Sequence, residues 1–153
     1  MAKVSAGLLL FRKAHCGIEV MLVHMGGPFW QRRDAGAWSI PKGEYPPTED
    51  PLAAARRELT EETGLAVPPG DPIDLGEVRQ SGGKVVRAWA LEADIDVSAI
   101  VSNTFELEWP RGSGKVQRFP EIDRAGWFDL ESAREKLVRG QVGFLERLVV
   151  RVG

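Results

Sequence analysis

Four charged residues, three of them glutamates, lie close together in the middle of the chain. They are Arg57, Glu58, Glu61 and Glu62, within the stretch GEYPPTEDPLAAARRELTEETGL that runs from 43 to 65. Carboxylates gathered in this way repel one another unless something cationic lies among them. Hard oxygen ligands in this number suit Mg²⁺ or Mn²⁺. The cluster therefore indicates a site for a divalent cation.

The residues around the cluster predict the helix that positions it. Asp50 suits an N-cap, Pro51 suits the first helical position, and Gly64 can adopt the left-handed conformation that closes a helix. These signals predict a helix from 51 to 63. In such a helix positions 58, 61 and 62 share one face, because they are related as i, i+3 and i+4. A separate apolar stripe can pack on a sheet: Leu52, Ala55 and Leu59.

A solvated acidic face is the alternative interpretation of three glutamates on a helix. The fixed spacing of residue types favours the metal site instead. The stretch from 43 to 65 resembles the Nudix box, the signature of the Nudix hydrolase family, with every defining position filled. Those positions are Gly43, Glu49, Arg57-Glu58-Leu59, Glu61-Glu62 and Gly64-Leu65.

The order of predicted elements indicates an α/β fold. We expect an α/β/α sandwich with a mixed β-sheet, the box helix on one face and the C-terminal helix or helices on the other. Strands are predicted at 4–11, 18–24, 75–79, 84–93, 105–109, 116–119 and 126–128, with 120–125 as a loop. Two further helices are predicted at 129–139 and 141–150, the second with an apolar stripe of Val142, Leu145 and Val149. The resemblance implies the same architecture as a single Nudix hydrolase domain over 1–153.

Length and composition agree with a small enzyme domain. The 153 residues suffice for one sizeable core, and 43% hydrophobic with 27% charged residues is ordinary for a globular chain. A net charge of −2 gives no reason to expect a stable nucleic-acid partner or a membrane. One cysteine, Cys16, excludes an internal disulfide framework, and no signal peptide or transmembrane stretch is apparent. We expect a cytoplasmic monomer or homodimer that binds a small-molecule nucleotide.

The resemblance assigns roles to the residues of the box. It implies that Glu58, Glu61, Glu62 and the backbone carbonyl of Gly43 hold Mg²⁺ or Mn²⁺, since a glycine lets the backbone approach the metal closely. Arg57 is expected to orient a neighbouring glutamate. The metal would neutralise the substrate phosphates and activate a water. Either Glu58 or Glu61 is expected to be the most sensitive to substitution, and the identity of the general base stays open.

A further glutamate lies outside the box. Glu121 precedes Trp127 by six residues, which is similar to the additional metal-binding glutamate of mutator-type members. Local pairing with Arg124 is the alternative interpretation. Glu49 is expected to brace its loop through Arg57. Weaker candidates for an extra ligand or base share one predicted strand: Glu106 and Glu108.

The loop from 25 to 36 supplies candidate substrate contacts. Trp30 lies beside Arg32 and Arg33, and such a group can stack on a nucleobase and attract phosphate. Packing of Trp30 against the core is the alternative. His24, just before this loop, could be a ligand or a base, but without a second histidine nearby we interpret it as structural.

The run WSIPKG, from 38 to 43, supplies two more candidates. It resembles the strand that leads into the box in diadenosine polyphosphate hydrolases and mutator-type nucleotide hydrolases. Trp38 and Lys42 are therefore candidate substrate contacts, with Lys42 facing the phosphates. Arg79, Lys84 and Arg87 could line a substrate groove or lie on the surface.

Together these residues predict a divalent-metal-dependent hydrolase that cleaves a diphosphate linkage in a nucleoside diphosphate derivative. The run WSIPKG favours dinucleoside polyphosphates or nucleoside triphosphates, and ADP-ribose or another nucleotide sugar is the alternative substrate. A non-catalytic nucleotide sensor or partner-binding module on the same scaffold is the alternative function. A nucleic-acid-binding domain is disfavoured by the near-neutral charge and the lack of a basic stripe.

Overall fold

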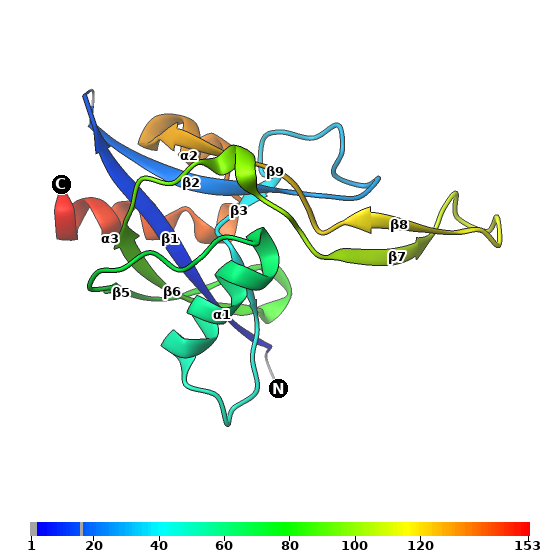
Figure 1. Ribbon diagram of the computed structural model, residues 1–153, viewed down its shortest axis with the longest axis horizontal. Helices are drawn as coiled ribbons and strands as arrows, with labels where there is room; N and C mark the ends of the chain where they lie inside the picture. The colour runs from blue at the N-terminus through cyan, green and yellow to red at the C-terminus, as the bar shows by residue number, and fades with distance from the viewer. Residues whose placement is uncertain (1–2, 16) are drawn as a thin grey trace.

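A mixed sheet forms the centre of the molecule, of which the computed structural model describes residues 3–15 and 17–153 (Figure 1). Its seven strands in the described residues are β1 (Val4–Ala14), β2 (Gly17–Met25), β3 (Trp38–Ser39), β4 (Lys42–Glu44), β5 (Ile73–Arg79), β6 (Val85–Glu92) and β9 (Ile122–Asp129). The helices are α1 (Pro51–Thr63), α2 (Leu130–Lys136) and α3 (Gly143–Val152), with short 3₁₀ turns at Ser81–Gly83, Val97–Ala99 and Arg139–Gln141. Two more strands, β7 (Thr104–Glu108) and β8 (Val116–Pro120), form a separate hairpin that extends away from the sheet (Figure 1).

The middle of the sheet is a parallel pair, β1 and β6. Their register runs from Val4 opposite Val85 to Phe11 opposite Glu92. On its other edge β1 pairs antiparallel with β4 near its start and with β2 near its end. β3 and β9 are antiparallel to β2, and β5 is antiparallel to β6. The first strand therefore contacts three neighbours, and one of them, β4, carries the beginning of the box.

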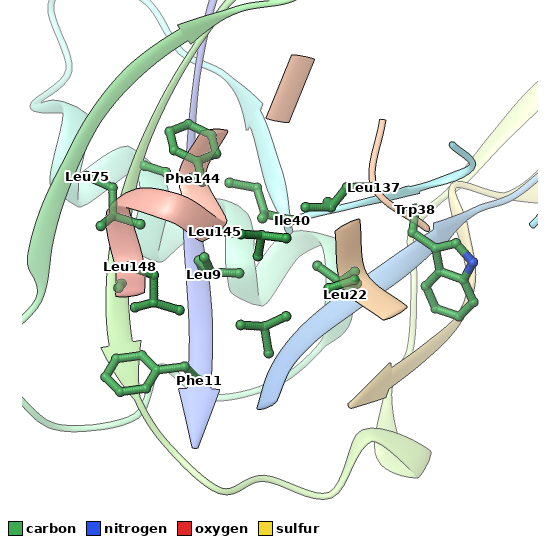
Figure 2. Packing of buried hydrophobic residues seen from close by; sticks show 14 of the residues in the cluster. Leu9, Phe11, Leu22, Trp38, Ile40, Leu75, Leu137, Phe144, Leu145 and Leu148 are labelled. Carbon is green, nitrogen blue, oxygen red and sulfur yellow. The ribbon is translucent and has the colours of Figure 1, made fainter. Parts of the chain in front are cut away.

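Side chains alternate across the sheet and build a core on each face. Ala6, Leu8 and Leu10 of β1 pack with the buried residues of α1. Leu9 and Phe11 pack on the opposite face with α2 and α3 (Figure 2). The buried α3 residues there are Phe144, Leu145 and Leu148. This arrangement confirms the predicted α/β/α sandwich. No helix in residues 3–15 and 17–153 is long and apolar enough to cross a membrane.

The prediction for the segment before Trp127 was wrong. Residues 122 to 125 belong to β9, which pairs with β2 from Met25 opposite Ile122 onward. Asp123 and Arg124 interrupt the apolar pattern that predicts a strand, and both are exposed in the structure. The backbone partner on β2 decides the conformation here, and a sequence pattern does not contain that partner.

The C-terminal helices also differ from the prediction. α2 ends at Lys136, because the backbone N–H of Val138 bonds to the carbonyl of Trp38 (2.8 Å) and draws the chain along β3. α3 begins at Gly143 rather than at 141. Its apolar stripe is shifted, since Val149 is 40% exposed while Leu148 is fully buried.

Candidate active site

Helix α1 begins and ends where its caps predict. The Asp50 carboxylate accepts a hydrogen bond from the N–H of Ala53 (3.0 Å), and Gly64 has a φ of 72° and donates to the carbonyl of Thr60 (2.8 Å). The residues of α1 that pack on the sheet are Ala54, Ala55 and Leu59. With that face against β1, the glutamates of α1 lie beside β4.

Arg57 is bonded to three carboxylates at once. Its Nε and Nη2 donate to the two oxygens of Glu49 (2.9 and 2.8 Å), as the predicted bracing contact requires. Its Nη1 donates to Glu58 and to Glu61, both at 2.9 Å. The pKa of Arg57 is held above its ordinary value. The hydrogen bond to Glu49 is the largest cause, and Glu61 and Glu58 contribute less. The same bond holds the pKa of Glu49 below its usual range.

Gly43 lets a glutamate of α1 lie directly against β4. A Cβ atom built on Gly43 would lie 2.0 Å from the carboxyl carbon of Glu58, a distance that no real contact allows. β4 is held in place by its pairing with β1, where Gly43 lies opposite Ala6. A glycine is therefore required at this position by space, and the Glu58 carboxylate contacts the main chain of the strand.

Glu62 is half-buried, whereas Glu58 is buried. The Oε2 of Glu62 accepts a hydrogen bond from the backbone N–H of Lys42 (3.2 Å). Burial raises the pKa of Glu62 to about 7, and the nearby charges of Glu58 and Glu121 add to the rise. Burial also raises the pKa of Glu58, with a further contribution from Glu61 and Glu121 against the opposing effect of Arg57. The carboxylates are thus incompletely neutralised by the cations around them.

Glu121 lies near the cluster at the end of β8. Its N–H bonds to the carbonyl of Asn103, and its carbonyl accepts from the N–H of Gly26, both at 2.8 Å. In the described residues Glu121 forms no ion pair with Arg124, whose guanidinium lies 5.2 Å from the ring centre of Trp38 instead. Glu106 and Glu108 are engaged within the hairpin, with Arg118 and with the turn at Gly112.

The donor set fits a divalent cation in its chemistry, although the carboxylates are engaged elsewhere. Within residues 3–15 and 17–153 no three acidic, histidine or cysteine side chains are already gathered so that they could hold a metal ion. Arg57 occupies one oxygen each of Glu58 and Glu61, and the main chain of Lys42 occupies one of Glu62. The oxygens of these carboxylates are nevertheless what a hard cation stabilises, and the pKa values of the buried Glu58 and the half-buried Glu62 are raised.

A cavity of about 560 Å³ lies beside Lys42, and none of Glu58, Glu61 and Glu62 lines it. Lys42 links the cavity to the carboxylates, because its backbone N–H bonds to Glu62 while the residue also lines the cavity. Val86, another lining residue, belongs to the core on the face of α2 and α3, so the cavity lies on the sheet face opposite α1. Trp30 lines the cavity and also packs partly on that core.

The other predicted substrate contacts lie elsewhere. Trp38 is only 4% exposed, packs edge-on against His24 and Phe128, and donates through Nε1 to Asp34 (2.8 Å). It is a core residue, because its ring is enclosed and leaves no face for a ligand. Arg32 and Arg79 are exposed and do not line this cavity.

His24 is structural, in line with its interpretation from the sequence. Its ring is fully buried, with Nδ1 2.8 Å from a carboxylate oxygen of Asp123 and Nε2 2.6 Å from the carbonyl of Arg33. It therefore ties the loop that carries Trp30 to β9.

Sequence reasoning missed most of the cavity wall, including Arg139 and Gln141. The Gln141 amide is fully buried: its Oε1 accepts from the N–H of Ile40, and its Nε2 donates to Ser39 and to Gln80, all at 3.0 Å. A glutamine at the predicted start of a helix gives no signal of this role. Its partners come from distant strands, so only the folded chain reveals it.

Known proteins identify the family of this chain but not its substrate. The NUDIX domain family model matches residues 1–148. Because this match covers nearly the whole chain, the chain belongs to the NUDIX family, and the prediction drawn from the box is confirmed.

Individual relatives are more distant. An RNA pyrophosphohydrolase of Roseobacter denitrificans is 48% identical over 52 residues, which are 31% of this chain and 32% of that protein, so the match spans about a third of that relative's length. An Ap4A hydrolase of C. elegans, solved as a binary complex, superposes with a TM-score of 0.67 at 23% identity, over 99% of this chain and 98% of that one. The NUDIX domain of Shewanella oneidensis NrtR, solved with ADP ribose, superposes with a TM-score of 0.65 at 15% identity, over 100% of this chain and 90% of that one. At these identities the solved structures show the fold alone.

Proposed function

We propose that this protein is a divalent-metal-dependent hydrolase that cleaves a diphosphate linkage in a nucleoside diphosphate derivative. The observation that carries the proposal is the carboxylate cluster, in which Glu58 lies against Gly43 and the half-buried Glu62 accepts a hydrogen bond from the backbone N–H of Lys42. Membership of the NUDIX family, with a pyrophosphohydrolase and an Ap4A hydrolase among its relatives, supports a pyrophosphohydrolase enzyme.

Each residue of the cluster has a part in this proposal. Glu58, Glu61, Glu62, Glu121 and the carbonyl of Gly43 would hold Mg²⁺ or Mn²⁺, which when bound neutralises phosphate charge and lowers the pKa of a coordinated water. Arg57 positions the glutamates and does not touch the substrate. Either Glu58 or Glu61 takes the proton of the attacking water.

The substrate class is proposed from the run WSIPKG and the cavity beside it. Dinucleoside polyphosphates or nucleoside triphosphates are favoured, and ADP-ribose or another nucleotide sugar is the alternative. Trp30 in the cavity wall offers a ring on which a nucleobase can stack, and Lys42, which lines the same cavity, offers a charge to a phosphate. The solved relatives with Ap4A hydrolase and ADP-ribose in their names share only the fold, so they do not choose between these classes.

A turnover screen with and without Mg²⁺ tests the proposal. The panel contains nucleoside triphosphates, dinucleoside polyphosphates, ADP-ribose and nucleotide sugars, with products identified by mass. We expect Mg²⁺-dependent cleavage of one class, and a loss of at least a hundred-fold in Glu61→Gln with the fold unchanged. Glu131→Gln, at an exposed position in the first turn of α2, is the control and should keep full activity. Full activity in a folded Glu61→Gln protein would contradict the proposed metal site.

One observation favours a second candidate, a nucleotide sensor without turnover. Arg57 bonds to both Glu58 and Glu61, so a binding module would need no metal to hold this arrangement. Tight binding of one nucleotide without cleavage, with or without Mg²⁺, would support the sensor. Cleavage that needs Mg²⁺ supports the hydrolase.

The proposal also covers location and assembly. The lone cysteine, Cys16, agrees with a cytoplasmic protein. We propose a monomer or a homodimer, since the cluster is built from one chain. Light scattering coupled to gel filtration distinguishes the two states.

A further inference from the structure

We infer that His24 and Asp123 form a positioning pair for the candidate active site. Their contact holds two separate parts of the site in place, which are the loop that carries Trp30 and the β-bulge that follows Glu121. The parts played by Trp30 and Glu121 belong to the proposed function, so the inference rests on it. The pair acts through these two residues rather than on the substrate itself.

Both ring nitrogens of His24 face oxygen atoms. Nδ1 lies 2.8 Å from a carboxylate oxygen of Asp123, and Nε2 lies 2.6 Å from the carbonyl oxygen of Arg33. A carbonyl oxygen only accepts hydrogen bonds, and so does an ionised carboxylate. A neutral ring has one N–H, so at one of the two contacts it would set a lone pair against an oxygen. Both contacts are therefore satisfied when each ring nitrogen carries a proton.

The Asp123 carboxylate supplies the charge that this form of the ring requires. The ring of His24 is fully buried, where an unpaired charge is costly, and it packs edge-on against Trp38 with 5.1 Å between the ring centres. Arg124 and Lys136 place cations 5.2 and 5.7 Å from the centre of the Trp38 ring. A neutral side chain at position 123 should therefore leave the histidine ring with a single proton.

Asp123 occupies a β-bulge near the start of β9. His24 of β2 lies opposite Arg124, whereas the next residue, Met25, lies opposite Ile122. The extra residue, Asp123, has no opposite residue in the ladder and is held by the ring of His24 instead. Bulges of this kind redirect side chains next to active sites. The hydrogen bond from His24 thus fixes the part of the strand that backbone pairing leaves free.

The bulge decides how β9 begins, directly after Glu121. Trp127 packs in the core under α1, and regular alternation would place position 123 there as well. Ile122 packs there instead, because the bulge shifts the alternation by one residue. The carbonyl of Glu121 accepts a hydrogen bond from the N–H of Gly26 (2.8 Å). The main chain of Glu121 is therefore held by β2 on one side and by the bulge on the other.

The second ring contact holds the loop that carries Trp30. Arg33 accepts from His24 through its carbonyl and donates through its N–H to the carbonyl of Trp30 (2.9 Å). The N–H of Trp30 bonds in turn to the carbonyl of Gly27 (3.2 Å). Trp30 lines the cavity beside Lys42. Release of Arg33 would therefore free the Trp30 ring from its place in the cavity wall.

Nitrogen NMR of the histidine ring tests the pair without any substrate. The chain has two histidines, so in His15→Gln, a change at an exposed position, only His24 remains. We expect both ring nitrogens to carry a proton at pH 7. In Asp123→Asn we expect one proton, on Nε2, because the new amide can donate to a bare Nδ1 and keep both contacts. A bare ring nitrogen in the folded His15→Gln protein overturns the inference.

Asp123→Ala removes the contact that Asp123→Asn keeps, so the two variants should differ. In Asp123→Ala we expect at least ten-fold faster hydrogen exchange at two amides, that of Gly26, which bonds to Glu121, and that of Arg33. Mn²⁺ should bind about ten-fold more weakly by calorimetry, as for loss of a group that orients a metal ligand. Asp123→Asn should restore both quantities to within about three-fold of the wild type.

These measurements need no turnover, so they separate the inference from the hydrolase proposal. The expected ring protons and exchange rates, in a protein that cleaves nothing or binds no Mn²⁺, support the pair and remove the hydrolase. Asp71→Ala, at an exposed position before β5, is the control. An Asp123→Ala protein that matches this control overturns the inference even if the enzyme is active. So does an Asp123→Asn protein as impaired as Asp123→Ala.

Discussion

The guanidinium of Arg57 donates two hydrogen bonds, 2.9 and 2.8 Å long, to the two carboxylate oxygens of Glu49. A bidentate pair of this kind fixes the plane of the guanidinium as well as its position. The remaining nitrogen, Nη1, is shared between Glu58 and Glu61. Glu49 is therefore a positioning residue, which sets the place of two candidate metal ligands without contacting either.

Removal of the Glu49 charge is expected to lower kcat. Glu49→Gln keeps the shape of the side chain but loses one of the two acceptor oxygens, so Arg57 can tilt and displace Glu58. We expect a ten- to hundred-fold loss, the usual effect of altering a residue that orients metal ligands, with little change in melting temperature. The assay is turnover as a function of Mg²⁺ concentration, in which the half-saturating concentration should rise.

Glu44→Gln is the matched control for that experiment. Glu44 lies on β4 next to Gly43, but its only ion pair is with Lys3 at 3.8 Å on the exposed surface of the described chain. It should keep the wild-type kcat and Mg²⁺ dependence. A Glu49→Gln protein that matches this control would show that Arg57 needs no brace.

A methyl group at position 43 should damage both stability and activity. In Gly43→Ala the new Cβ atom would overlap the Glu58 carboxyl group, which must move away from β4. Overpacking of this kind costs about 1–3 kcal/mol, and displacement of Glu58 should abolish most turnover. Urea unfolding and the turnover assay measure the two effects.

Gly143→Ala makes the same chemical change without the crowding. A Cβ atom there would lie 3.8 Å from Val78, an ordinary contact, at the first residue of α3. Stability should be unchanged or slightly higher, because alanine favours a helix. A Gly43→Ala protein as stable as Gly143→Ala would mean that Glu58 does not lie against the strand.

The stability of the metal-free protein should fall as the pH rises from 5 to 8. Glu62 has a pKa of about 7 in the folded chain, against an ordinary value of 4.5 that applies to the unfolded chain. Between these values the folded state binds the proton more tightly than the unfolded state does. The stabilisation is therefore complete below about 4.5 and is lost as the pH approaches 7. Urea unfolding in the presence of EDTA at several pH values measures the slope.

Glu62→Gln should flatten this pH dependence. The amide has no proton to lose, so the contribution of position 62 vanishes, and Glu58, whose pKa burial also raises, accounts for the slope that is left. Glu131→Gln should keep the wild-type slope. Identical slopes in the wild type and Glu62→Gln would contradict the burial of this carboxylate. Added Mg²⁺ should also reduce the slope, since a cation stabilises the charged form.

The edge of the sheet at β5 is covered by α3. Arg147 donates through Nη1 to the carbonyls of Leu75 and Glu77, both at 2.8 Å, and Arg151 donates to that of Asp74 (3.2 Å). Arg147→Ala should lower the free energy of unfolding by about 1–2 kcal/mol and expose the edge to pairing between molecules. Gel filtration at increasing concentration should then show self-association. Arg134→Ala, which removes only a surface pair with Glu146, should stay unchanged.

The box helix could be predicted from sequence because its signals are local. Asp50, Pro51 and Gly64 each act on backbone groups a few residues away, so the pattern alone determined both ends of α1. β9 could not be predicted in full, since its first residues are polar and are held by β2. The end of α2 was likewise set by the distant carbonyl of Trp38.

The candidate site also contains residues that local signals predict and residues that only distant contacts position. The glutamates of α1 follow from helical spacing, and the contact between Glu49 and Arg57 follows from their charges. Trp38 was misplaced because a conspicuous aromatic residue in a run that resembles a known motif can still serve the core. Arg139 and the Gln141 amide come from a turn that is positioned by long-range hydrogen bonds, which no local pattern encodes.

The parallel pairing of β1 with β6 has a consequence for biosynthesis. Val4 lies opposite Val85, so β1 must wait until β6 has been synthesised before this edge is paired. Until then the apolar run VSAGLLLF is exposed, and the long chain closure slows folding. β4 and α1 are synthesised during this wait. A nascent chain that stalls between Leu65 and Val85 therefore carries every residue of the box while this edge of β1 is still unpaired.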